Sequence, residues 1–409
     1  MTRRLARALA PVTVGLIASL STAQAADVVG TVRFFKVAKS SFDAYTKAPT
    51  PEQQAWMRSH YWRMLVYAPY FDSRLGWFPN AWVYKDLYAI YVGSDLATSH
   101  PEWILHDQGG KSLFIPYACS GGTCPQFAAD IGDPTFRGHW IAEASAIMTK
   151  GYRGLFVDDV NMTISRISDG SGHAVPAVDR RTGRTLGDTE WRGYMATFTE
   201  EIRAAFPTAE IVHNNLWFVG HDDPAVQREL LATDWINLER GVNDSGITGG
   251  GGTYGFDTFL GYIDWLHGHG KAIVFDAGVP DDAGREYGLA TYFATGAGRD
   301  LVGNTPRSTP SDWWPSYDVS LGNALGARRA WNGVIRRDFE RGTVLVKPPG
   351  SASQTIQLDG TYTDLTGQPR TQVTLGPASG TVLTKPATPP PPPPAAPDAP
   401  MVLDLTPVR

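Results

Sequence analysis

The 409-residue sequence predicts a (β/α)8 barrel over residues 26–330, followed by a small antiparallel β domain over residues 331–385. Between about residues 31 and 304, eight short apolar runs alternate with segments of helical period. The runs are rich in Val, Ile, Phe and Tyr, which is typical of parallel strands buried on both faces. After about Arg336 the pattern changes to short alternating strands separated by Gly and Pro. Eight runs favour a closed barrel over an open sheet.

The first 25 residues predict a cleavable signal peptide. Three arginines precede an apolar stretch over residues 8–20, and Ala23-Gln24-Ala25 is a cleavage signal, so the mature chain starts at about Ala26. The apolar stretch is too short for a membrane span, and no later run of about 18 apolar residues follows. We therefore expect a secreted or periplasmic protein whose mature chain does not insert into a membrane.

The charge balance narrows the class of partner. Three of the 36 basic residues lie in the signal peptide, so the mature chain has 33 basic and 41 acidic residues and a net charge of −8. Phosphate binding needs a basic surface, so this balance disfavours nucleic acid and fits a neutral or cationic ligand. Cys119 and Cys124 could close a small disulfide loop in an oxidising compartment. A zinc site is the weaker interpretation, because no further Cys or His pair lies nearby.

The predicted strands of the barrel are 31–37, 63–69, 87–93, 126–132, 154–160, 210–215, 234–240 and 271–277. Two of the connecting segments have a clear helical pattern. One places Trp191, Met195, Phe198 and Ile202 on a single apolar face. The other, residues 256–270, ends in Gly and leads into the strand at 271.

The C-terminal region is predicted to form short antiparallel strands over residues 342–348, 354–360, 361–365, 371–377 and 380–386. Residues 386–409 contain six consecutive prolines, Pro389 to Pro394, and we expect an extended tail that belongs to no core.

Acidic and amide side chains occur where the predicted barrel strands end: Asp130, Asp158, Asp159, Asn214, Asn215, Glu239 and Asp276. The carboxyl ends of all strands of a (β/α)8 barrel meet on one face, which carries the active site. Several carboxylates on one face, with no metal or cofactor required, are typical of glycoside hydrolysis. One carboxylic acid protonates the leaving oxygen, and a second carboxylate attacks the anomeric carbon or activates a water.

Within this set we assign Asp158 as nucleophile or water-activating base and Glu239 as general acid. As general acid, Glu239 has to be protonated near neutral pH. Side chains alternate along a strand, so Asp158 and Asp159 cannot both point the same way, and one of them has a structural role. Asp159, Asp130, Asp276, Asn214 and Asn215 are assigned to substrate binding or to orienting the catalytic pair. Alternatives are an ion pair of Glu239 with Arg240 and a structural role for Asp130 or Asp276.

Aromatic residues are expected to stack on sugar rings, and Trp77 and Trp217 are the candidates. The sequence motifs of nucleotide-binding proteins, metal-dependent deacetylases and serine hydrolases are incomplete or absent. The glycine run at 249–255 lacks the Lys-Ser/Thr ending of a phosphate-binding loop. No H-x-x-x-H pair of a metal-dependent deacetylase and no G-x-S-x-G turn of a serine hydrolase is present.

Three segments, "GYRGLFVDDVNM", "DWINLERGVND" and "YFATGAGRDLVGN", resemble hypothetical glycosyl hydrolase family 15. They are also similar, more distantly, to endo-α-1,4-polygalactosaminidase-like barrels. The resemblance runs from about residue 31 to 384 and implies a sugar-cleaving barrel with a C-terminal β domain. In such families the acid that closes a strand like 154–160 is the usual catalytic candidate, and it corresponds to Asp158. Asp159 corresponds to the position that follows it, and Glu239 corresponds to the acid at the end of a later strand. A glycan-binding barrel without catalysis and a transglycosylase remain alternatives, and the oligomeric state is open.

Overall fold

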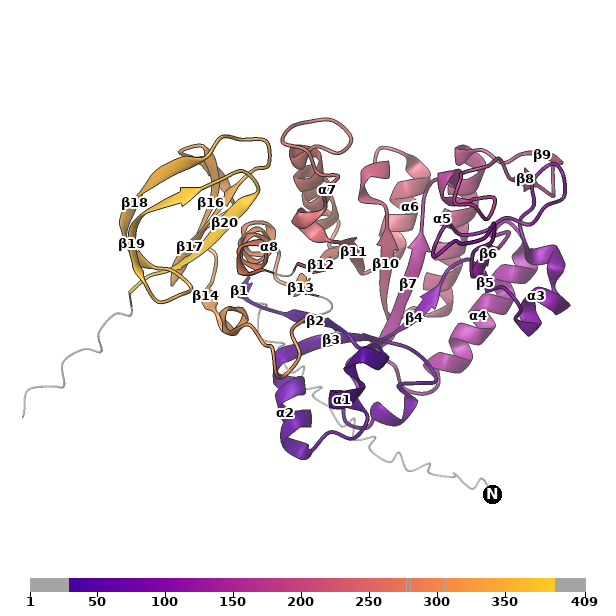
Figure 1. The fold of residues 1–409 in the computed structure, drawn as a ribbon, viewed down its shortest axis with the longest axis horizontal. Coiled ribbons are helices and arrows are strands. Elements are labelled where there is room, and N and C mark those ends of the chain that lie inside the picture. The colour runs from indigo at the N-terminus through magenta and orange to yellow at the C-terminus, as the bar shows by residue number, and fades with distance from the viewer. Residues whose placement is uncertain (1–28, 277, 280, 305–306, 387–409) are drawn as a thin grey trace, which may run out of the picture.

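The computed structural model describes residues 29–276, 278–279, 281–304 and 307–386. The predicted signal peptide and the predicted tail from residue 387 onward lie outside the described residues. The described chain forms a barrel with a lobe of loops on one side and a β-sheet on the other (Figure 1). No helix in the described part has the length and apolar character needed to cross a bilayer.

Eight parallel strands close into a barrel, which confirms the predicted fold class. They are β2 (Phe34–Val37), β3 (Tyr61–Val66), β4 (Ala81–Asp86), β7 (Gly154–Val160), β10 (Glu210–Asn215), β11 (Trp235–Glu239), β12 (Ala272–Asp276) and β13 (Leu301–Gly303). Neighbours in the barrel are neighbours along the chain, and β13 closes onto β2. All carboxyl ends of the strands therefore lie on one face.

Two of the eight predicted strands are wrong. The runs at 87–93 and 126–132 contain β5 (Ala89–Tyr91) and β6 (Gln126–Ala128), which pair antiparallel with each other outside the barrel. The third and eighth barrel strands are instead β4 and β13, which no predicted run covered. The two misread runs are apolar because residues such as Ile90 and Ala128 are buried in the large apolar core outside the barrel. Apolar composition reports burial and does not distinguish barrel strands from other buried strands.

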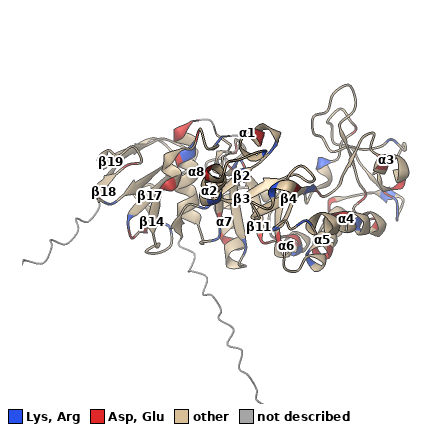
Figure 2. Cartoon of the chain, turned by 90° about the horizontal axis from the view of Figure 1, so that it is seen from below, with Lys and Arg blue, Asp and Glu red and all other residues tan. Residues whose placement is uncertain are grey.

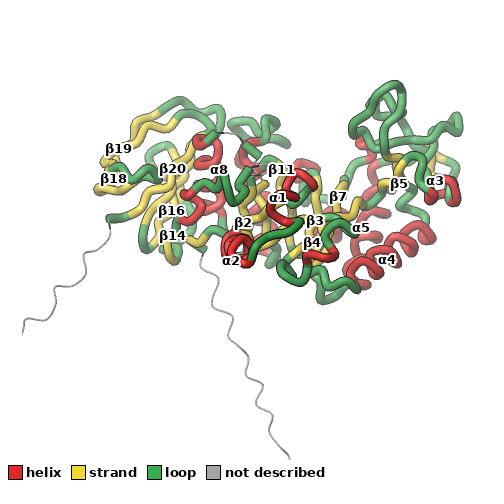
Figure 3. Tube along the Cα trace, turned by 60° about the horizontal axis from the view of Figure 1, so that its bottom comes forward, coloured by secondary structure: helices red, strands yellow, loops and turns green. Residues whose placement is uncertain are grey.

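This lobe follows β4 and extends from residue 87 to about residue 133. Figure 3 shows it mainly as loop, standing off the barrel near β5 and α3 (Asp95–Ser99). Backbone hydrogen bonds between Phe114 and Ser168 join it to the loop that follows β7. That loop carries the short pair β8 (Val178–Asp179) and β9 (Arg184–Thr185). Cys119 and Cys124 form a disulfide in the lobe, as the sequence predicts.

The helices are α1 (Asp43–Thr46), α2 (Pro51–His60), α4 (Pro134–Met148), α5 (Asp188–Ala205), α6 (Pro224–Ala232), α7 (Phe256–Gly268) and α8 (Asp282–Thr295). Several begin at side chains that accept a hydrogen bond from the first turn, namely Thr50, Asp133, Asp223 and Asp281. In α5 the predicted apolar face is confirmed, because Trp191, Met195, Phe198 and Ile202 are all fully buried. Burial of that face against the barrel stabilises the helix.

The barrel interior holds its own apolar cluster, which includes Phe35, Phe156, Trp235 and Val274. A larger cluster fills the layer between the strands and the helices. At the amino-terminal end of the barrel, Glu210 accepts two hydrogen bonds from Arg63, both of 2.7 Å, and one of 2.7 Å from the Trp82 indole. This ion pair closes the end of the barrel opposite the predicted site.

The C-terminal sheet has the strand order β15-β16-β17-β20-β18-β19. Its strands are β15 (Arg329–Trp331), β16 (Val334–Phe339), β17 (Gly342–Lys347), β18 (Gln354–Thr363), β19 (Pro369–Leu375) and β20 (Ser379–Thr384). The two predicted strands at 354–360 and 361–365 form one strand, β18, with an irregular register. A further short pair joins β1 (Gly30–Thr31) to β14 (Ser320–Gly322).

The sheet packs on α8. The carboxylate of Glu286 on this helix accepts hydrogen bonds from the Thr381 hydroxyl and the Val382 N–H of β20. A Cβ at Gly380 would lie 2.8 Å from the Ala290 Cβ, so only glycine allows this close approach of strand and helix. In the view of Figure 2, acidic and basic positions alternate along the ribbon.

Candidate active site

The strand register places the predicted acids at the carboxyl end of the barrel. Residues two apart on a strand lie on the same side. Phe156, Trp235 and Val274 face the barrel interior, so Asp158 on β7, Glu239 on β11 and Asp276 on β12 lie on the interior side of their strands. Among the predicted acids, the structure brings these three together at the mouth of the barrel.

Asp158 is held by three hydrogen-bond donors. Its Oδ2 accepts from the Tyr84 hydroxyl at 2.8 Å, and its Oδ1 accepts from Asn214 Nδ2 at 2.7 Å and from the N–H of Asp159 at 2.9 Å. Both oxygens are engaged, so the carboxylate has one orientation. Hydrogen bonds to a charged acceptor are the strong ones. Asp158 is half-buried, which leaves it in reach of a ligand from the mouth.

Asn214 continues this network toward β11. Its Oδ1 accepts from Asn237 Nδ2 at 3.0 Å. Asn237 is buried, and its own Oδ1 has no hydrogen-bond partner within the described residues. An unpaired buried carbonyl typically costs about 1–3 kcal/mol. The chain Tyr84–Asp158–Asn214–Asn237 thus connects three neighbouring strands to the one that carries Glu239.

Asp159 lies beside this network and pairs with Asp86. It has φ of +57°, which is rare outside glycine, and it lies in a bulge of β7 between Val157, the register partner of His213, and Val160, the register partner of Asn215. The expected alternation of Asp158 and Asp159 therefore does not hold here. The carboxyl groups of Asp159 and Asp86 lie next to each other, and Asn161 Nδ2 donates to Asp159 at 2.9 Å. Burial and the neighbouring carboxylates raise the pKa of Asp86 well above its usual range and that of Asp159 to about 6. These raised pKa values favour one proton held between the two carboxyls, beside Asp158.

Glu239 is exposed at the last position of β11. Its register partner is Asp276 on β12, and it lies two residues beyond Asn237, or about 7 Å further toward the mouth. No ion pair of Glu239 occurs within the described residues, so the alternative of a pair with Arg240 is not observed. The next residue, Arg240, has a left-handed backbone.

Asp130 lies in the lobe and not at the end of a barrel strand. It is buried, and both of its oxygens accept hydrogen bonds from the Arg181 guanidinium at 3.0–3.1 Å. Burial raises the pKa of this carboxyl, while Arg181 opposes the rise. The ion pair fastens the lobe to the loop that follows β7. Its carboxylate is occupied by this structural contact.

Asn215, Trp217 and Trp77 are also placed apart from the three acids. Asn215 Nδ2 donates to Glu229 at 3.3 Å and to the Tyr262 hydroxyl at 3.1 Å, on the helix side of β10. Trp217 is 7% exposed and packs edge-on against Phe259 at 5.1 Å, so little of its ring is available for stacking. The Trp77 carbonyl accepts from Arg58 on α2, the helix that leads into β3, so this residue lies at the opposite end of the barrel.

Four residues of this region were not predicted from the sequence: Tyr67, Tyr84, Asp86 and Asn237. The signal that could have found Tyr84 and Asp86 is their even spacing from Trp82 in β4, but the predicted strand began at residue 87, just after β4 ends. Tyr67 lies two residues after Leu65, which faces the barrel interior, and so has the same spacing signal. Its ring lies 4.9 Å from that of Tyr84.

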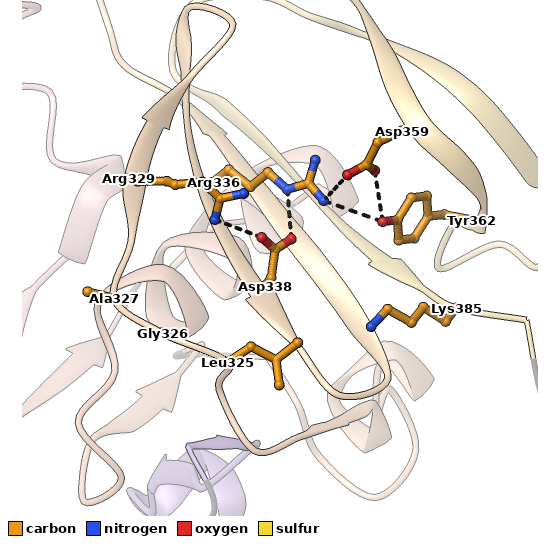
Figure 4. Close-up of a pocket in the computed structure, with 9 residues that line it drawn as sticks. All are labelled: Leu325, Gly326, Ala327, Arg329, Arg336, Asp338, Asp359, Tyr362 and Lys385. Carbon is orange, nitrogen blue, oxygen red and sulfur yellow. Dashed lines mark hydrogen bonds and ion pairs between the residues drawn. The ribbon is translucent and has the colours of Figure 1, made fainter.

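A separate surface pocket of about 320 Å³ lies on the C-terminal sheet (Figure 4). Its charged groups are paired with one another. Asp338 accepts from Arg329 and Arg336 at 2.7 Å each, and Arg336 also reaches Asp359 at 2.8 Å. Lys385 donates to two backbone carbonyls. This pocket is distant from the barrel acids, and no group of three or more metal-binding side chains occurs in the described part of the chain.

A closed parallel barrel with carboxylates at its mouth is compatible with glycoside hydrolysis. Residues 64–223 match the family model described as hypothetical glycosyl hydrolase family 15, which confirms the resemblance expected from the sequence over that stretch. The match includes Asp158 and Asn214 and ends before Glu239. It supports a glycosidase-like function. No curated protein matches the chain.

Solved structures with a similar barrel include the glycoside hydrolase domain of PelA from Pseudomonas aeruginosa. It is 15% identical, with a TM-score of 0.41, over 67% of this chain and 94% of that chain. An α-amylase from Lactobacillus plantarum is 11% identical, with a TM-score of 0.46, over 86% and 98%. An isomalto-dextranase from Arthrobacter globiformis is 13% identical, with a TM-score of 0.48, over 88% and 73%.

Proposed function

We propose that the protein is a glycoside hydrolase that cleaves O-glycosidic bonds of a poly- or oligosaccharide with Asp158 and Glu239. The observation that carries the proposal is the Asp158 carboxylate, which is held by Tyr84 and Asn214 on the same face of the barrel as Glu239. A carboxylate fixed by donors on both oxygens suits a nucleophile or a base, because its position is set before the sugar arrives.

In this mechanism Asp158 attacks the anomeric carbon or removes a proton from the attacking water. The bond from the anomeric carbon to the leaving oxygen breaks, and the proton of Glu239 passes to that oxygen. Glu239 is open to water in the free protein. A sugar that covers it would exclude that water, and burial favours the neutral, proton-donating form of a carboxyl group. We assign Asp276, the register partner of Glu239, to binding a sugar hydroxyl or orienting the catalytic pair.

Two further parts of the proposal come from the sequence. Residues 1–25 favour export to the periplasm or the exterior, and a disulfide suits an oxidising compartment. The excess of acidic side chains at the barrel mouth favours a neutral or cationic glycan over an acidic one.

The test is release of reducing ends from a panel of bacterial exopolysaccharides and neutral glycans. Wild type is compared with Asp158→Asn and Glu239→Gln, and the matched control is Glu340→Gln, which changes an exposed carboxylate of the C-terminal sheet. We expect both barrel variants to lose activity while their circular dichroism stays unchanged, and the control to behave as wild type. Binding of a glycan without cleavage by wild type would instead support the non-catalytic alternative.

A further inference from the structure

Exposed aromatic side chains cluster on the face that carries Asp158. Four large aromatics are exposed within the described residues: Tyr91 (56%), Tyr117 (68%), Tyr254 (47%) and Trp62 (41%). The three tyrosines lie on loops that follow barrel strands at their carboxyl ends, whereas Trp62 lies near the start of β3. Exposed apolar surface gathered on one face marks a binding region. Tyr91 and Tyr117 are the two that belong to one loop.

The backbone of the lobe fixes these two tyrosines. Tyr91 is the last residue of β5 and the register partner of Gln126 on β6. On the other side of β6, the N–H of Ile115 donates to the Gln126 carbonyl at 3.1 Å, which places Tyr117 two residues beyond that contact. The disulfide between Cys119 and Cys124 closes the turn that follows. Both rings are therefore carried by the edges of one small sheet and are exposed although their backbone is held.

Tyr67 connects this pair to the Asp158 carboxylate. The N–H of Leu87 donates to the Asp158 carbonyl at 3.0 Å, and Tyr91 follows four residues later at the end of β5, so the lobe strand that carries Tyr91 starts beside the acid. Burial and the nearby Asp158, Tyr91 and Tyr117 raise the pKa of the Tyr67 hydroxyl to about 12. The Tyr67 ring is 4.9 Å from the Tyr84 ring, and the Tyr84 hydroxyl donates to Asp158. A row of tyrosines thus leads from the lobe to the acid.

The chemistry of the row fits a sugar. A tyrosine presents an apolar ring face and a polar hydroxyl, and a pyranose presents a face of C–H groups with a rim of hydroxyls. Ligand sites combine aromatic surface with a few convergent polar groups. The ring faces of Tyr91 and Tyr117 therefore suit the C–H face of a sugar and not an ionic group.

We propose that Tyr91 and Tyr117 form a subsite that binds one pyranose ring of the glycan, next to the ring that is placed at Asp158. This inference rests on the proposed function, since the neighbouring ring is the one to be cleaved. It assigns the stacking role to tyrosines of the lobe in place of the tryptophans considered from the sequence.

The test measures glycan binding separately from cleavage. All binding variants are made in the Asp158→Asn background, so that the probe is not consumed. The probes are immobilised bacterial exopolysaccharides, α-glucans, β-glucans, galactans and chitosan oligosaccharides of about four or more sugars. The variants are Tyr91→Ala/Tyr117→Ala and Tyr91→Phe/Tyr117→Phe. Trp62→Ala is the matched control, because it removes an exposed aromatic ring at the other end of the barrel.

We expect the double alanine variant to bind the best glycan at least about tenfold more weakly, as for truncation of a central aromatic contact. The double phenylalanine variant keeps both rings and should bind within about threefold of its parent. Trp62→Ala should bind as its parent does. Equal binding by the double alanine variant, or no binding of any probe by the parent, would overturn the proposal.

The subsite and the hydrolase can fail independently. If protein with Asp158 and both tyrosines intact binds a glycan but releases no reducing ends, the hydrolase proposal fails. The subsite stands in that case, provided that the double alanine variant loses binding. If protein with all residues intact cleaves the glycan, and Tyr91→Ala/Tyr117→Ala cleaves it with an unchanged KM, the subsite fails and the hydrolase stands.

Discussion

The Asp86–Asp159 pair predicts that one conservative substitution stabilises the protein in a pH-dependent way. In Asp159→Asn, the amide oxygen can still accept from Asn161, and the amide N–H can donate to Asp86 where the shared proton now lies. The amide is neutral at every pH, so the cost of ionising a carboxyl in this buried position disappears. The substitution therefore imitates the protonated form of Asp159.

The sign follows from the pKa. Burial raises the pKa of Asp159 from 3.8 to about 6, so between these values the folded state binds the proton more tightly than the unfolded state does. Stability of the native protein is therefore lost as the pH rises through this window. The full rise corresponds to about 3 kcal/mol, an upper bound because the two carboxyls are coupled. Asp159→Asn should recover this free energy above about pH 7 and have little effect below about pH 4.

The assay is urea-induced unfolding of both proteins at pH 4, 6 and 8, followed by circular dichroism. We expect the urea midpoint of Asp159→Asn to exceed that of wild type at pH 8 and to approach it at pH 4. The control is Asp222→Asn, which makes the same change of atoms at an exposed position just before α6. A lower midpoint for Asp159→Asn at pH 8, or a difference that does not change with pH, would refute the reasoning.

Three further predictions concern the barrel. Tyr84→Phe removes the 2.8 Å hydrogen bond to Asp158. Because a hydrogen bond to a charged group contributes about 1.5–3 kcal/mol, kcat should fall about 10- to 100-fold with KM little changed. Steady-state kinetics that show an unchanged kcat would contradict this. Glu210→Gln breaks the buried ion pair with Arg63 and should lower the free energy of unfolding by about 3–5 kcal/mol in urea titrations at pH 7. Arg63 holds the pKa of Glu210 below its usual range in spite of burial. The loss of unfolding free energy in Glu210→Gln should therefore shrink as the pH falls through the lowered pKa of Glu210. A loss of stability that is constant down to pH 2 would count against the ion pair. Gly380→Val should weaken packing of the sheet on α8 by about 1–3 kcal/mol, and an unchanged thermal midpoint would show that α8 can move away.

The fold class could be predicted because a barrel repeats one local pattern eight times. Six of the predicted runs coincide with barrel strands, and the errors at β4 and β13 do not change the class. The α5 face is the clearest success, since a helix of 18 residues contains several turns of the same period. β13 is only three residues long and carries too little pattern to identify.

The candidate site was predictable only in part, for a different physical reason. The position of Asp158 and Glu239 along the barrel axis depends on where their strands end. The end of a strand can be predicted when an apolar run in the sequence stops at an acidic residue. The contacts of the lobe depend on the three-dimensional path of a long loop. The sequence of such a loop has no repeating apolar pattern from which that path could be predicted. Asp130 is an example. Its neighbours in the sequence resemble the end of a strand, but its carboxylate accepts hydrogen bonds from Arg181, which lies in a loop distant in the sequence. The roles of Asp158, Glu239 and Asp276 stay predictions.

The most direct test of the central claim compares Asp158→Asn with Asp159→Asn on the glycan that wild type cleaves fastest. The two substitutions change adjacent carboxylates by the same atoms, but only Asp158 accepts hydrogen bonds from Tyr84 and Asn214. We predict that Asp158→Asn reduces the rate of reducing-end release by at least about 1,000-fold, as expected for loss of a nucleophile or base, and that Asp159→Asn stays within about tenfold of wild type. Full activity of Asp158→Asn, with loss confined to Asp159→Asn, would contradict the account.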